Sequence, residues 1–178
     1  MKTLAALALM VLVTPALADL KVGTPAPDFT LPATLGGKEF TFRLADALKK
    51  GPVVVYFYPA AFTTGCTVEA HEFAAAMPQF AAAGASVIGV SHDDIKTLDK
   101  FSTSECQSKF PVAADADKKV MRGYDATMLL GITASRTSYV IGQDGKVKFA
   151  FSAMDPDGHV EGTLKAAQAL KRPAPTAP

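Results

Sequence analysis

The eight residues PAAFTTGC, Pro59 to Cys66, lie between an apolar run, Val53 to Tyr58, and an amphipathic run that begins at Thr67. This order predicts a buried strand, a tight loop and a helix. Cys66 then stands at the start of the helix, where unpaired backbone N–H groups and the positive end of the helix dipole favour thiolate over thiol. The stretch therefore predicts a nucleophilic cysteine, while a buried, inert cysteine fits the composition alone just as well.

Two residues of the loop favour the catalytic interpretation. Thr63 lies three residues before Cys66, and a loop folded onto the helix start brings its hydroxyl beside the sulfur. A group that both donates and accepts hydrogen bonds suits attack on a peroxide, because the incoming oxygen must be held in line while charge builds on the departing one. Pro59 fixes φ and removes one N–H, which stiffens the loop.

Pro59, Thr63 and Cys66 match the Pro-x-x-x-Thr/Ser-x-x-Cys signature of the peroxiredoxins, and the chain resembles this family well beyond the signature. The further similar stretches are APDFTLP at 26–32, VIGVSHD at 87–93 and SRTSYVIGQDGKV at 135–147. The resemblance implies a thiol-dependent peroxidase, an oxidoreductase with antioxidant function that reduces hydrogen peroxide and organic hydroperoxides.

The stretch GCTVEA, at 65–70, is most similar to the Q-type branch, also called bacterioferritin comigratory proteins. Members of this branch usually read Gly-Cys-Thr-x-Glu-Ala-Cys. The present chain departs from that pattern, because His71 stands at the last cysteine position and Thr64 replaces a common proline. We expect His71 to be an ordinary surface histidine, and we expect no functional cluster around His92 or His159.

The resemblance assigns Arg136 to the active site, because it stands just before the strand TSYVI as the family's arginine does. A guanidinium stays charged at any relevant pH, favours a thiolate by charge pairing, and can donate hydrogen bonds to peroxide oxygens. Glu69 follows Cys66 by one helical turn and can pair with Arg136, which would hold the guanidinium in place. A solvated carboxylate is the alternative for Glu69.

Peroxide attack converts Cys66 to a sulfenic acid, with which a second thiol must condense before further oxidation. Cys106 is the remaining cysteine of the chain. By resemblance to Q-type proteins that carry the resolving cysteine in the helix after the next strand, Cys106 is expected to form an intramolecular disulfide with Cys66. A thioredoxin-like partner or a small thiol would reduce it. A buried spectator cysteine is the alternative.

Residues 1–18, MKTLAALALMVLVTPALA, contain one lysine, an apolar core at Leu4 to Val13 and a small-x-small ending. This pattern is typical of a secretory signal peptide, and the apolar core is too short to cross a bilayer. We expect cleavage after Ala18 and export to the periplasm. One domain, 19–172, and a disordered tail, 173–178, would remain; a retained membrane anchor is the alternative.

Charge and composition exclude some partners. Without Lys2, the 18 basic residues become 17 against 17 acidic ones, and the basic residues are scattered along the chain. No nucleic-acid partner is therefore expected. We also expect no stable membrane association, no cofactor and no metal. Two cysteines in an oxidising compartment can form one disulfide, either structural or catalytic. Since no cysteine follows Cys106, an intersubunit disulfide of the two-cysteine type is not expected, and we expect a monomer.

The order of predicted elements indicates an α/β fold with a mixed sheet, which the resemblance makes thioredoxin-like. Helices flank the sheet, and a β-hairpin precedes it. The expected strands are 22–42 (a hairpin turning at Gly36 and Gly37), 53–58, 85–90, 110–113, 137–141 and 147–151; the expected helices are 44–50, 67–83, one carrying Ile95, Leu98 and Phe101, 118–124 and 158–170.

A different class of function also fits this fold, namely thiol–disulfide exchange or metal transport by an exported protein. Exchange proteins use Cys-x-x-Cys, but Thr63 and Glu69 stand three residues on either side of Cys66. Copper carriers of this fold use Cys-x-x-x-Cys, and Ala70 stands in the second position. A merely structural disulfide in a binding protein is a third hypothesis, under which peroxide would leave the reduced protein unreactive.

Overall fold

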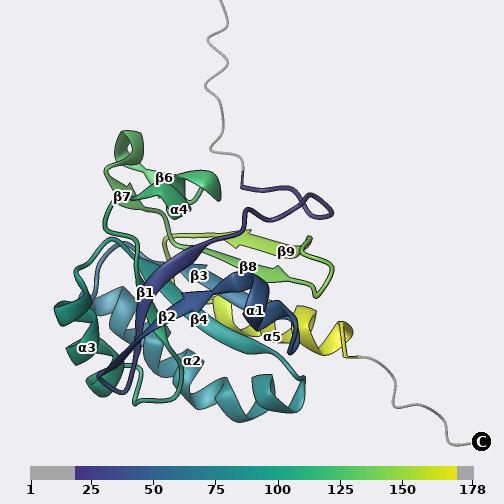
Figure 1. Ribbon diagram of the computed structural model, residues 1–178, viewed down its shortest axis with the longest axis horizontal. Helices are drawn as coiled ribbons and strands as arrows, with labels where there is room; N and C mark the ends of the chain where they lie inside the picture. The colour runs from purple at the N-terminus through teal and green to yellow at the C-terminus, as the bar shows by residue number, and fades with distance from the viewer. Residues whose placement is uncertain (1–18, 172–178) are drawn as a thin grey trace, which may run out of the picture.

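The computed structural model describes residues 19–171 of the chain (Figure 1). The expected signal peptide, 1–18, and the expected tail, 173–178, lie outside the described residues. Between residues 19 and 171, no helix combines the length and the apolar character needed to cross a membrane.

Seven strands form one mixed sheet in the order β2-β1-β5-β4-β3-β8-β9 (Figure 1). Strands β3, β4 and β5 run parallel, β8 pairs antiparallel with β3, and β1 pairs antiparallel with β5. The strands are β1 Thr30–Leu35, β2 Lys38–Arg43, β3 Val53–Phe57, β4 Ser86–Ser91, β5 Val112–Ala114, β8 Thr137–Ile141 and β9 Val147–Ser152. The predicted hairpin at the N-terminus, turning at Gly36 and Gly37, is confirmed as β1–β2.

Helices cover both faces of the sheet, as the sequence predicts. Residues of α2, α3 and α5 belong to one apolar cluster, and residues of α1 and α4 belong to a second cluster on the opposite face. The helices are α1 Leu44–Leu48, α2 Thr64–Ala82, α3 Ile95–Ser104, α4 Lys119–Gly123 and α5 His159–Ala169. The architecture is therefore a mixed α/β sandwich with the sheet in the middle.

Strand β3 is buried on both faces and lies at the centre of this sandwich. Its side chains alternate, so that Val54 and Tyr56 join one apolar cluster while Val55 and Phe57 join the other. Full burial of each such side chain contributes about 1.5–3 kcal/mol of hydrophobic free energy. The strand is thus a rigid base for the loop that begins at Pro59.

Helix α2 starts three residues earlier than the sequence predicts, at Thr64 instead of Thr67, so Cys66 lies inside the first turn. Its end agrees with the prediction. Gly84 has φ +72°, in the left-handed region that glycine adopts without strain, and Ala85 N donates to Phe80 O at 2.9 Å. This pattern satisfies carbonyls at the helix C-terminus.

Between α4 and β8 the structure contains elements that sequence reasoning missed. They are the two-residue strands β6 Thr127–Met128 and β7 Thr133–Ala134, joined by a 3₁₀ turn, η1 Leu129–Gly131. Two residues are too few to show the alternation that marks a strand, which explains the omission.

Candidate active site

The loop from Pro59 to Thr63 carries the chain from the end of β3 to the start of α2, and residues of other elements hold it in place. Asp93, just after β4, accepts hydrogen bonds through Oδ2 from Ala61 N at 2.8 Å and from Ser91 Oγ at 2.7 Å. Thr133 of β7 donates through its hydroxyl to Pro59 O at 3.2 Å. The predicted stiffness of this loop therefore has a tertiary cause besides the proline.

The sulfur of Cys66 lies against the side chain of Arg136, which directly precedes β8. Nη2 of Arg136 donates to Cys66 Sγ at 3.6 Å, and both residues are almost wholly buried, at 1% exposure for Cys66 and 3% for Arg136. Gly65 makes this approach possible, because a Cβ atom at that position would lie only 2.8 Å from the same Nη2 atom. The sulfur of Cys66 thus faces a permanent cation and the start of a helix, the surroundings in which reactive cysteines are found.

Three protein groups orient the guanidinium of Arg136. Its Nε donates to Met154 O at 3.0 Å, its Nη1 donates to Gly65 O at 3.5 Å, and Nη1 also donates a hydrogen bond to Glu69 Oε2. Glu69 is fully buried, so the alternative of a solvated carboxylate does not describe it. Burial raises the pKa of Glu69 to about 8, and the nearby guanidinium opposes that rise.

Thr63 is the N-cap residue of α2, and its side chain is exposed. Its hydroxyl donates to Ala60 O at 3.1 Å, a bond within the loop, instead of contacting the sulfur of Cys66 as expected. Its backbone carbonyl accepts from Thr67 N at 2.9 Å. The structure places Thr63 one helical turn before Cys66, and a direct contact with substrate stays a prediction.

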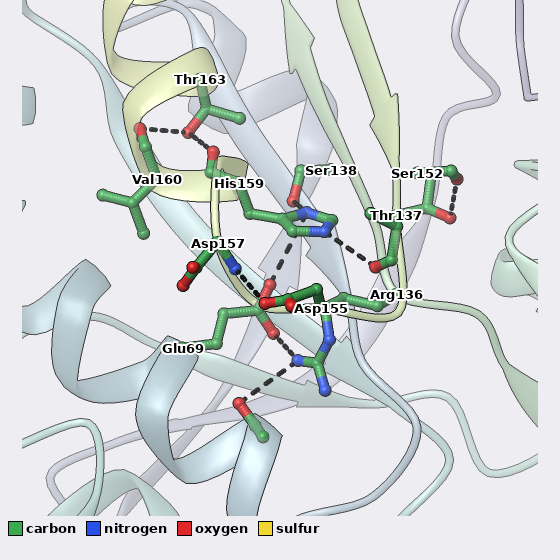
Figure 2. A network of polar contacts seen from close by, with 12 residues as sticks. Glu69, Arg136, Thr137, Ser138, Ser152, Asp155, Asp157, His159, Val160 and Thr163 are labelled. Carbon is green, nitrogen blue, oxygen red and sulfur yellow. Dashed lines mark hydrogen bonds and ion pairs between the residues drawn. The ribbon is translucent and has the colours of Figure 1, made fainter.

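The prediction that no cluster surrounds His159 is wrong. His159 is fully buried at the start of α5, and its Nδ1 lies 3.7 Å from Glu69 Oε1 (Figure 2). Nδ1 also shares a hydrogen bond with Ser138 Oγ at 2.8 Å, and Nε2 bonds to Ala153 O at 3.0 Å. Sequence reasoning missed it because His159 reaches the site from a helix that begins 90 residues after Glu69.

Cys106 lies two residues beyond the end of α3 and is fully buried. It belongs to the same apolar cluster as Cys66, and both cysteines are free thiols. Burial raises the pKa of the Cys106 thiol well above its ordinary value, and the charge of Glu105 adds to the rise. In contrast, His71 is half-exposed, as expected of a surface histidine, and lies 3.0 Å from Glu105 Oε2.

The fold and the site together define a class of protein. A thiol in the first turn of a helix, beyond the central strand of a mixed sheet and beside a buried guanidinium, is the arrangement of a thiol-based oxidoreductase with a thioredoxin-like fold. Within residues 19–171, no cluster of three or more His, Cys, Asp or Glu side chains has the geometry to hold a metal ion.

Comparison with known proteins gives the family. Residues 22–150 match the AhpC/TSA family. Peroxiredoxin Bcp of Xanthomonas campestris pv. campestris is 34% identical over 160 residues, which cover 85% of this chain and 96% of that protein. The chloroplastic Peroxiredoxin Q of Oryza sativa subsp. japonica is 35% identical over 150 residues, covering 83% of this chain and 67% of that protein.

Solved structures agree with this assignment. The crystal structure of Peroxidoxin BcpB from Mycobacterium tuberculosis aligns with a TM-score of 0.78 at 34% identity, covering 86% of this chain and 99% of that one. Peroxiredoxin Q of Xanthomonas campestris aligns with a TM-score of 0.69 at 31% identity, covering 80% and 92%. The chain therefore belongs to the AhpC/TSA family and is a peroxiredoxin of the Bcp and Q type, a thiol-dependent peroxidase.

Proposed function

We propose that Cys66 is the peroxidatic nucleophile of this enzyme. The observation that carries the proposal is the 3.6 Å contact between Cys66 Sγ and Arg136 Nη2 in the first turn of α2. The thiolate attacks one peroxide oxygen, an S–O bond forms while the O–O bond breaks, and the departing oxygen leaves as water or an alcohol once it takes up a proton. Cys66 becomes a sulfenic acid.

Arg136 favours the thiolate and donates hydrogen bonds as negative charge moves from sulfur to the departing oxygen. Glu69 holds the guanidinium through Nη1, while Nη2 contacts the sulfur. Thr63 orients the peroxide through its hydroxyl, and Pro59 keeps the loop rigid. These roles for Thr63 and Pro59 follow from the signature and from their positions at the two ends of the loop.

Cys106 then resolves the sulfenic acid. Its sulfur attacks Cys66, a disulfide forms and water leaves, so a dithiol reductant such as a thioredoxin-like protein, or a small thiol, must restore both thiols. Because Cys106 is buried and its pKa is raised, it is a poor nucleophile in the folded reduced protein. Resolution therefore requires the segment after α3 to open.

The substrates we propose are hydrogen peroxide and organic hydroperoxides. Solved structures of the Xanthomonas campestris bacterioferritin comigratory protein address its alkyl peroxide reduction activity, and that protein is 31% identical to this chain. In this chain, Phe62 of the active-site loop is about half exposed and packs edge-on against Phe101, with ring centroids 5.2 Å apart. An exposed ring in this loop offers an apolar surface to an alkyl group.

We also propose that the enzyme acts in the periplasm as a monomer. The signal-peptide pattern of residues 1–18 supports export, and the absence of a cysteine after Cys106 supports a monomeric disulfide cycle. Size-exclusion chromatography with light scattering, and fractionation of cells that express the full chain, test these two points separately.

The central test is stopped-flow reduction of peroxide by the reduced protein with each cysteine replaced in turn. Cys66→Ser should abolish peroxide consumption, because a serine hydroxyl is not ionised at neutral pH. Rapid consumption by Cys66→Ser would contradict the proposal. The alternative function, thiol–disulfide exchange, predicts instead that the protein reduces a disulfide substrate and does not react rapidly with peroxide.

A further inference from the structure

One carboxyl oxygen of Glu69, Oε1, has no role in the proposed reaction. Oε2 pairs with Arg136, but among the described residues Oε1 has no hydrogen-bond partner, although it is buried. His159 Nδ1 lies 3.7 Å from Oε1 (Figure 2). A buried acceptor without a donor costs free energy. The stability of this arrangement therefore depends on which atoms of Glu69 and His159 carry protons.

The ring of His159 has an assignable tautomer. Nε2 lies 3.0 Å from Ala153 O, and a carbonyl oxygen only accepts, so Nε2 carries a proton. Nδ1 of the neutral ring is then an acceptor, and the Ser138 hydroxyl donates a hydrogen bond to it at 2.8 Å. An ionised Glu69 would therefore place its free oxygen opposite a second acceptor, with no proton between the two.

We propose that Glu69 is protonated in the reactive enzyme, and that His159 is a positioning residue that keeps Glu69 uncharged. The proposal rests on the proposed roles of Cys66 and Arg136. With Glu69 protonated, the positive charge of Arg136 acts on the sulfur of Cys66 alone. With Glu69 ionised, two anions share that charge, and the thiolate and the departing oxygen receive less of it.

Burial is the main reason why Glu69 holds a proton near neutral pH. Burial raises the pKa of Glu69 to about 8; Arg136 opposes the rise, and Glu72 on the same helix adds to it. Burial lowers the pKa of His159, and Arg136 adds to that effect, while the bond to Ala153 O and the charge of Asp155 oppose it. The remaining neighbour of the imidazole is the uncharged ring of Phe151, with centroids 4.8 Å apart.

The direct test is infrared spectroscopy of the reduced enzyme at about pH 7. The difference spectrum between wild type and Glu69→Gln should contain the carbonyl band of one protonated carboxyl, which disappears above about pH 8. His159→Asn supplies an amide that can donate to Glu69, so the band should be lost at neutral pH. His71→Asn, the same substitution at the surface of α2, is the matched control and should retain the band.

The kinetic test is single-turnover peroxide reduction against pH. Wild type should show a several-fold fall in rate centred near the pH at which the band disappears, and Glu69→Gln, which cannot ionise, should show no such fall. Absence of the band in wild type, or its retention in His159→Asn, would overturn the proposal. If His159→Asn does not fold, the proposal is still overturned when the fall of the single-turnover rate at alkaline pH persists in Glu69→Gln. Since the infrared band requires no turnover, its result is independent of whether Cys66 is the nucleophile.

Discussion

The two cysteines of this enzyme are equally buried but face opposite chemical surroundings. Cys66 lies in the first turn of α2, 3.6 Å from a guanidinium nitrogen of Arg136. Cys106 lies just past the C-terminus of α3, next to the carboxylate of Glu105 and among apolar side chains. One thiol therefore faces two sources of positive charge, and the other faces apolar groups and negative charge.

The comparison teaches that burial alone does not decide whether a thiol reacts. Without a compensating cation, burial disfavours the charged thiolate and makes a cysteine inert, as at Cys106. With a cation in contact, burial strengthens the electrostatic interaction because water is excluded. Under the proposed mechanism, the difference also gives the reaction an order, in which Cys66 is expected to react in the folded state and Cys106 only after its segment opens.

The largest effect is expected on removing the second thiol. Cys106→Ser should reduce one equivalent of peroxide at nearly the wild-type rate and then stall with Cys66 oxidised, until a small thiol is added. Stopped-flow measurement of the first turnover, followed by steady-state assay with and without the thiol, checks this. Continued turnover with a thioredoxin-like reductant alone would show that Cys66 is reduced directly and that Cys106 is a spectator.

Formation of the disulfide should also loosen the structure around both cysteines, because Cys66 lies in the first turn of α2, Cys106 lies beyond the end of α3, and Cys106 must leave the core. Hydrogen exchange should become faster at 64–70 and 103–110 in the oxidised wild type. Gln107 and Ser108, with φ of +51° and +55°, occupy the left-handed region without being glycine, which makes this segment easier to open. Unchanged exchange at 103–110 would argue against opening.

Removing the guanidinium of Arg136 should make the thiol of Cys66 less reactive, and so more similar to that of Cys106. Arg136→Ala should slow the first turnover by about 10²–10³, the usual cost of removing a charge-stabilising donor. It should also lower the rate of alkylation by iodoacetamide at neutral pH, because the sulfur then lacks a neighbouring cation. Arg122→Ala, at an exposed arginine that bonds to loop carbonyls, is the matched control. Equal rates in wild type and Arg136→Ala would contradict the assigned role.

A smaller effect is expected on stability in alkali. The raised pKa of Cys106 means that the unfolded chain loses this proton at a lower pH than the folded protein does. Above about pH 9, the free energy of unfolding should therefore fall with pH, with a slope contribution approaching about 1.4 kcal/mol per pH unit. Urea unfolding of reduced wild type and Cys106→Ala at several pH values checks this, and parallel curves for the two proteins would contradict it.

Much of the fold could be predicted because its signals are local. The apolar run of β3, the periodicity of α2 and the turn at Gly36 and Gly37 each specify one element, and all three are present. The contact between Glu69 and Arg136 could also be predicted. The family resemblance assigned Arg136 to the active site, and helical spacing put Glu69 on the same helix face as Cys66.

Other parts of the site depend on contacts that no local pattern encodes. Asp93 stands at the end of the stretch VIGVSHD and had no expected role, yet its carboxylate anchors the loop through Ala61 N. His159 was expected to have no cluster, because nothing near it in sequence shows that α5 packs beside Glu69. The hydroxyl of Thr63 bonds within its own loop, since a nearby carbonyl offers it an acceptor.

The most direct test of the contrast between the two thiols is to trap the first oxidised species. Reduced protein receives one equivalent of peroxide in the presence of dimedone, which labels sulfenic acids, and the labelled peptides are mapped by mass spectrometry. The account predicts a dimedone adduct on Cys66 in the Cys106→Ser variant and no adduct on Cys106 in the Cys66→Ser variant. An adduct that forms equally fast on Cys106 when Cys66 is absent would contradict the account.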